Sequence, residues 1–146
     1  MSVFSSLNIS ATGMTAQRLR TDIISQNIAN VNTTRTSDGT PYVRKTVVFQ
    51  EKTTSGFSLA LTNALSGNTG SGVKVSTIAE DNETAMKRVY DPSNPDADEE
   101  GYVTYPNVDT VTEMTNMIDA SRSYEANVTA FNATKSMALK GLEVGK

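Results

Sequence analysis

The side chains available for chemistry in this sequence are mainly carboxylates, because the chain has no Cys and no His. Disulfides, thiol chemistry and most zinc sites are therefore excluded. The densest group of acids lies in residues 91–101, where Asp91, Asp96 and Asp98 could offer hard oxygen ligands to calcium. The segment lacks the flanking helices of an EF-hand and carries prolines at unsuitable positions. We therefore interpret it as an exposed acidic turn and predict no metal site.

Other kinds of functional site are also missing from the sequence. We find no nucleophile and base pair, no phosphate loop and no metal cluster, so we predict no catalytic residue, no cofactor and no enzyme activity. The net charge of −3 and the scattered basic residues give no electrostatic basis for nucleic-acid binding. No apolar run approaches the roughly 20 residues of a membrane span, and the first residues lack the pattern of a Sec signal peptide. We expect neither membrane insertion nor a cleaved signal.

Residues 107–146 carry the strongest structural signal. Steps of three and four residues from Met114 to Leu142 meet nine positions, seven of them apolar or aromatic, which is the period of a helix that buries a narrow stripe. A helix from about Val108 to Leu142, capped by Asn107 or Asp109, would be on the order of 50 Å long at 1.5 Å per residue. Such a helix is too long for a compact domain of this size, so it needs a partner.

A second helical pattern covers residues 5–31 and is weaker, because Gly13 costs a helix about 1 kcal/mol relative to Ala. Two long stripes at the two ends of the chain favour a coiled-coil pair over an ordinary globular core. We call the predicted contact positions of the two helices the seam. The seam residues are Leu7, Met14, Ile24, Ile28, Met117, Tyr124, Val128, Phe131 and Leu142.

The middle of the chain reads as short strands, expected at residues 42–50, 73–78, 86–90 and 101–106. The predicted class is α+β and mainly helical, with a small β-rich domain between two long helices that pair as a coiled coil. Its parts are an N-terminal helix (1–32), a β-rich outer domain (33–106) with a flexible loop at about 53–72, and a C-terminal helix (107–146).

Several motifs along the chain match those of a known family. Residues 25–33, with Asn27, Ile28, Ala29, Asn30 and Thr33, are similar to the signature that closes the N-terminal helix in bacterial flagellar rod and hook proteins. Residues 41–45, 90–92, 95–103 and 106–109 and the run 117–128 resemble members that build the proximal rod. The resemblance covers nearly the whole chain except about residues 53–72.

This resemblance implies a structural subunit of the rod that crosses the periplasm and transmits torque. It implies export by the flagellar type III apparatus without a cleaved signal peptide, and assembly with copies of itself and with other rod proteins. Its neighbours would lie on the motor-ring and export-gate side and on the distal-rod side. Two alternatives remain open, another rod or hook-junction subunit of the same family and a free-standing coiled-coil adaptor.

On this interpretation the seam residues carry packing within and between subunits, and the alternative is a helix pair with no assembly role. Ser121 could permit close approach of the helices, and Lys135 could lay its methylenes over the seam. We further expect Asn30 or Asn32 to hold the turn after the first helix, because Asn tolerates left-handed conformations and bonds to its own backbone.

Overall fold

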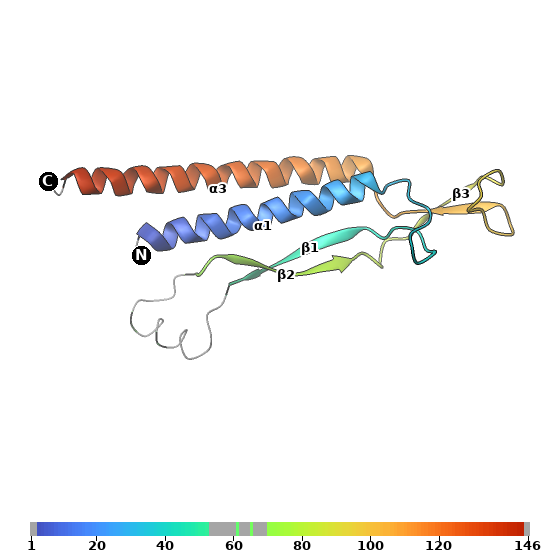
Figure 1. Ribbon diagram of the computed structural model, residues 1–146, viewed down its shortest axis with the longest axis horizontal. Coiled ribbons are helices and arrows are strands. Elements are labelled where there is room, and N and C mark those ends of the chain that lie inside the picture. The colour runs from blue at the N-terminus through green and yellow to red at the C-terminus, as the bar shows by residue number, and fades with distance from the viewer. Residues whose placement is uncertain (1–2, 53–60, 62–64, 66–69, 145–146) are drawn as a thin grey trace. The chain divides into compact units, whose positions relative to one another are not determined.

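The computed structural model describes residues 3–52, 61, 65 and 70–144. Figure 1 shows long helices near the two ends of the chain and paired strands between them. In chain order the elements are α1 (Val3–Ala29), β1 (Lys45–Glu51), β2 (Val73–Glu80), β3 (Lys87–Tyr90), β4 (Tyr102–Tyr105) and α3 (Thr110–Val144). This confirms the predicted α+β, mainly helical class. The flexible loop expected at about 53–72 lies mostly outside the described residues.

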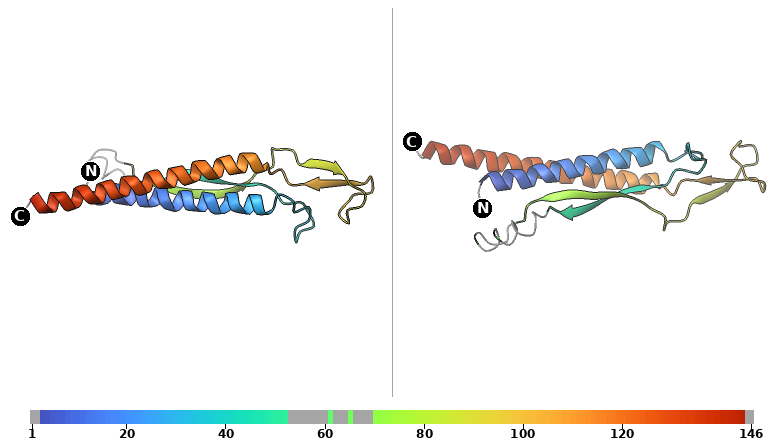
Figure 2. Two further views of the ribbon diagram at one scale, coloured as in Figure 1. Left: turned by 90° about the horizontal axis from the view of Figure 1, so that it is seen from above. Right: turned by 60° about the horizontal axis from the view of Figure 1, so that its bottom comes forward.

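Within each of the two compact units described below, segments of α1 and α3 lie side by side and antiparallel, as Figures 1 and 2 show. A Cβ added at Gly13 would lie 2.7 Å from the side chain of Asn127, and the side chains of Asn27 and Glu113 are hydrogen-bonded at 2.9 Å. α3 begins at Thr110, two residues later than predicted, because Asp109 rather than Asn107 caps it.

The strands form two separate two-stranded sheets, β1 with β2 and β3 with β4. β3 and β4 pair antiparallel, with Lys87 opposite Tyr105 and Tyr90 opposite Tyr102. β1 begins at Lys45, three residues later than predicted. The physical reason is that the preceding backbone is bound elsewhere, since Tyr42 N donates to the carbonyl of Thr33 and Arg44 N donates to the side chain of Asn107.

By its contacts the chain divides into two compact units. Unit 1 comprises residues 1–19, 48–77 and 120–146, and unit 2 comprises residues 20–47 and 78–119. Each long helix therefore contributes one part to each unit. The sequence-based division at residues 32 and 106 remains a prediction about how the chain is organised.

The buried residues differ between the units. In the described part of unit 1 the buried side chains are Ser10, Ala16 and Ala120, all of them small. Unit 2 buries larger side chains, including both apolar and polar ones. They are Ile23, Ile24, Asn27, Val103, Pro106, Asn107 and Glu113. No helix among the described residues is both long and apolar enough to cross a membrane.

Candidate functional site

Asn27, near the end of α1, is completely buried in unit 2 and makes four side-chain hydrogen bonds. Its amide nitrogen donates to the carbonyl of Lys45 at 2.8 Å and to Glu113 Oε2 at 2.9 Å. Its amide oxygen accepts hydrogen bonds from Lys45 N and from the Tyr42 hydroxyl, both at 2.9 Å. All four hydrogen-bonding positions of the amide are thus used. Asn27 joins α1 to the start of β1 and to α3.

Glu113, in the first turn of α3, is the second buried member of this network, with 1% of its surface exposed. Arg44 donates to Glu113 Oε1 from Nε at 2.9 Å and from Nη2 at 2.7 Å. A buried carboxylate is tolerated when a cation and further hydrogen-bond donors surround it. Here Arg44 binds Oε1 of Glu113, and the amide nitrogen of Asn27 donates to Oε2. The pair therefore fixes α3 against the residue that precedes β1.

Asn107 extends the network to the segment after β2. Its side-chain oxygen accepts from Arg44 N at 2.9 Å, and its nitrogen donates to the carbonyls of Asp81 at 2.7 Å and Thr84 at 3.2 Å. Segments that lie far apart in the chain are thus joined by side-chain hydrogen bonds. We call the group Asn27, Tyr42, Arg44, Asn107 and Glu113 the polar clasp.

The electrostatics of the clasp favour its hydrogen bonds. Burial raises the pKa of Tyr42 above its ordinary value of 10.0, and the carboxylates of Glu113 and Glu80 raise it further. The phenol therefore stays protonated and can donate to Asn27. At the adjacent helix start, hydrogen bonds from the side chain and backbone of Thr112 hold the pKa of Asp109 below 3.8. Asp109 is therefore ionised at neutral pH and favourable at the N-terminus of α3.

The turn after α1 is held by Asn30. Its amide nitrogen donates to the carbonyl of Gln26 at 2.9 Å, and its oxygen accepts from the Thr33 hydroxyl at 3.1 Å. Asn32 is exposed, and its side chain makes no hydrogen bond within the described residues. Neither Asn adopts the left-handed conformation that this residue type tolerates, because positive φ values among the described residues occur at glycines alone. Ordinary helical-turn geometry and side-chain bonds close this turn instead.

The predicted seam residues are placed unequally. Ile24 is buried, whereas Tyr124 and Leu142 are 40% and 71% exposed. The others are half-buried, namely Leu7, Met14, Ile28, Met117, Val128 and Phe131. Ser121 and Lys135 are exposed, and the roles expected of them at the seam remain predictions.

The less exposed positions of α3 include small and polar residues beside the half-buried apolar ones. Glu113, Ala120, Asn127 and Thr134 follow each other at heptad spacing and are buried or half-buried. The close approach of Gly13 to Asn127 shows why, because small side chains allow two helix backbones to come near each other. Gly13 thus has a packing role that its helix propensity did not indicate.

Several large apolar side chains of α3 are exposed to solvent in the single chain. Val111, Met114 and Ile118 are 72%, 55% and 53% exposed, and their spacing of three and four residues puts them on one face. Farther along the helix, Met137 and Leu142 are 65% and 71% exposed. An apolar stripe left exposed on a helix indicates a surface that is covered by another protein.

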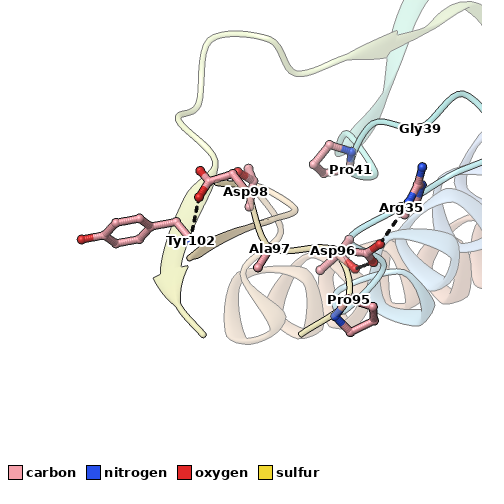
Figure 3. A pocket seen from close by; sticks show the side chains of 10 residues that line it. Arg35, Gly39, Pro41, Pro95, Asp96, Ala97, Asp98 and Tyr102 are labelled. Atoms are coloured by element: carbon pink, nitrogen blue, oxygen red, sulfur yellow. Dashed lines mark hydrogen bonds and ion pairs between the residues drawn. The ribbon is translucent and has the colours of Figure 1, made fainter. Parts of the chain in front are cut away.

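The acidic turn and the loop before β1 enclose a shallow groove of about 300 Å³, which Figure 3 shows. Asp96 accepts a hydrogen bond from Thr34 at 2.7 Å and forms an ion pair with Arg35 at 3.5 Å. Asp98 accepts from Tyr102 N at 2.8 Å, the main cause of its lowered pKa. These carboxylates therefore hold the turn together. No cluster of three possible metal-ligating residues occurs among the residues that the structure describes.

Sequence reasoning identified Asn27 as a motif residue but missed Arg44, Asn107 and Glu113 as its partners. Arg44 and Asn107 do lie in segments that carried the resemblance, residues 41–45 and 106–109. Glu113 had no signal of its own, because a charged residue in the first turn of a helix is usually a solvated one. A polar residue at a heptad position facing the other helix is the pattern that could have revealed it.

The clasp joins residues of α1 and α3, the long helices from the two ends of the chain. Two family models match, Flagella basal body rod protein over residues 7–35 and Flagellar basal body rod FlgEFG protein C-terminal over residues 99–144. These ranges contain Asn27 and Glu113, the buried clasp residues of α1 and α3. The class is therefore that of flagellar basal-body rod proteins.

Full-length relatives narrow the class. The chain is 52% identical to the flagellar basal-body rod protein FlgC of Bacillus subtilis, with 100% of both chains covered. It is 45% identical to FlgC of Borreliella burgdorferi, covering 99% of this chain and 98% of the relative, and 42% identical to FlgC of Escherichia coli O6:H1, covering 100% of both. The chain belongs to the FlgC family of flagellar basal-body rod proteins. It is a structural rod subunit located in the basal body.

Proposed function

We propose that this chain is a subunit of the proximal rod and polymerises, with copies of itself and with other rod proteins, into the drive shaft that transmits torque across the periplasm. Its neighbours lie toward the motor ring and export gate on one side and toward the distal rod on the other. The flagellar type III apparatus exports it. In this role it has no catalytic activity, and the predicted seam residues serve packing within and between subunits.

The observation that carries this proposal is the exposed apolar stripe of α3. Val111, Met114 and Ile118 lie on a face that the fold of the single chain does not cover. Each such side chain contributes about 1.5 to 3 kcal/mol when it is fully buried. Contacts between neighbouring subunits would bury this face, and full-length likeness to FlgC proteins supports an assembly of that kind.

Site-directed crosslinking in a flagellated strain that lacks its own FlgC tests the proposal, and the absence of Cys from the chain removes any background. A Met114→Cys variant should restore motility and give crosslinked products that contain neighbouring rod subunits. An exposed residue of the acidic turn, changed as Ser93→Cys, is the matched control and should give fewer products.

Failure of the unchanged chain to restore motility, with normal amounts of protein made, would contradict a role in the rod. Crosslinks to distal-rod subunits but not to proximal-rod subunits would instead assign the chain to a different position in the shaft. The identity of the crosslinked neighbours thus separates the proposed position from the rival one.

A further inference from the structure

Charge is divided unevenly between the two units. Unit 1 contains seven Lys and Arg against three Asp and Glu, a net charge of +4. Unit 2 contains six Lys and Arg against thirteen Asp and Glu, a net charge of −7. The two values account for the net charge of −3 of the whole chain. The mild overall charge therefore hides two compact units of opposite sign.

The ion pairs sharpen this contrast. Among the described residues, every ion pair joins two residues of unit 2. Lys135 and Lys140 on α3 are exposed and have no carboxylate partner in the described part of the chain. In unit 2, Glu99 is exposed without an ion-pair partner among those residues, and Glu100 reaches Arg88 only at 3.9 Å. Exposed cations thus outnumber exposed carboxylates on the C-terminal part of α3, and unit 2 keeps an excess of carboxylates over its cations.

We propose that these charges direct the association of this chain with a second copy of itself, the acidic unit 2 of one copy meeting the basic unit 1 of the next. The inference rests on the proposed function and specifies the chemistry of one subunit contact. Complementary charges accelerate encounter and disfavour the contacts of two like units. A contact between different surfaces of two copies is heterologous, and such contacts continue into rings or helical assemblies.

The test measures self-association of the purified full-length chain by sedimentation equilibrium in 50 mM and 500 mM NaCl. Because salt screens exposed charges, the dissociation constant should rise about tenfold between these conditions. Glu99→Lys with Glu100→Lys raises the net charge of unit 2 from −7 to −3, and Lys135→Glu with Lys140→Glu lowers that of unit 1 from +4 to zero. Each double variant should associate about tenfold more weakly than the unchanged chain in low salt.

Mixing the two double variants provides the decisive comparison. The unchanged unit 1 of the first variant can still meet the unchanged unit 2 of the second, so the mixture should recover the original affinity but stop at dimers. A chain that carries all four substitutions should not recover it. Circular dichroism checks that each variant keeps the helix content of the unchanged chain.

A dissociation constant that is the same in both salt concentrations would overturn this inference. So would a mixture of the two double variants that associates no more tightly than either variant alone. Absence of self-association at any concentration tested would overturn it as well. These results would leave the rod function intact if the unchanged chain restores motility in the strain without FlgC. Failure of that restoration would instead count against the proposed function.

Discussion

Asn27 is difficult to replace because it acts as donor twice and as acceptor twice within a completely buried site. Asp has nearly the same shape, but its ionised carboxylate cannot donate to the carbonyl of Lys45 or to Glu113. It would also place a second negative charge beside the buried carboxylate of Glu113. Burial therefore makes the choice between amide and carboxylate decisive at this position.

The variant Asn27→Asp should consequently lower the free energy of unfolding by about 3 kcal/mol or more, because it breaks two buried hydrogen bonds and adds a like charge. Urea unfolding followed by circular dichroism measures the change. Asn32→Asp is the matched control, since Asn32 is exposed, and it should change stability by less than about 0.5 kcal/mol. Equal effects of the two substitutions would show that the clasp does not stabilise the fold.

A second prediction at the residue scale concerns acid. The pKa of Asp109 is held below 3.8 by hydrogen bonds that exist only in the folded chain. A lowered folded pKa stabilises the fold above the unfolded value, and this stabilisation is lost as pH falls through 3.8 and then through the folded pKa. Asp81 and Asp98 are shifted in the same direction for the same kind of reason.

Stability measured by urea unfolding should therefore be nearly constant between pH 7 and pH 5 and should fall below about pH 4. Asp109→Asn keeps a capping side chain that does not titrate, so this variant should lose less stability over the acidic range than the unchanged chain. An identical acid profile for the two proteins would contradict the role given to Asp109.

At this scale the sequence predicted single residues better than their partners. Asn27 and Asn30 were recognised from a family motif, and the exposed acidic turn from its composition. The partners of Asn27 were missed because Lys45 and Glu113 lie 18 and 86 residues away in the chain. Periodicity and turn signals report neighbours within a few residues, so they carry no information about such contacts.

At the scale of the helices, the sequence predicted their existence and pairing because the 3.6-residue period persists over many turns. The apolar stripe expected on α3 matches its less exposed positions only in part. Met117, Val128 and Phe131 of that stripe are half-buried, whereas Ala120 is buried and Asn127 half-buried without belonging to it. In a subunit that is covered by neighbours, the apolar stripe need not face the chain's own partner helix.

A double-mutant cycle can test the close contact between Gly13 of α1 and Asn127 of α3. Gly13→Ala should by itself gain up to about 1 kcal/mol of helix propensity, but its Cβ would collide with Asn127, which donates to the carbonyl of Ser123. We expect no net gain in the unchanged chain and a gain of about 1 kcal/mol in an Asn127→Ala background. Thermal unfolding of the four proteins gives the coupling.

Gly141→Ala is the control for this cycle, because no atom lies within 4 Å of a Cβ added there. Its effect should be the same with Asn127 and with Ala at position 127. Additive effects of Gly13→Ala and Asn127→Ala would argue against close packing at this point of the two helices.

At the scale of the whole chain, the two units differ in what they bury. Unit 2 encloses Ile23, Ile24 and Val103 together with the polar clasp, whereas the described part of unit 1 encloses Ala16, Ala120 and Ser10. Burial of apolar area is the dominant favourable term in folding, and small side chains contribute little of it. On the proposed function, we therefore expect the stability of unit 1 to depend more on contacts with neighbouring subunits than that of unit 2.

Hydrogen exchange of the full-length chain at low concentration should reveal this difference. Amides of residues 20–29 and 110–119 should be protected, whereas those of residues 3–19 and 120–144 in the same two helices should exchange faster. Polymerisation should then slow exchange in the second group and raise the helix content seen by circular dichroism, because neighbouring subunits supply the packing that unit 1 lacks. Uniform protection along both helices before assembly would contradict this account, since a chain that is already fully helical alone would gain no order from its neighbours.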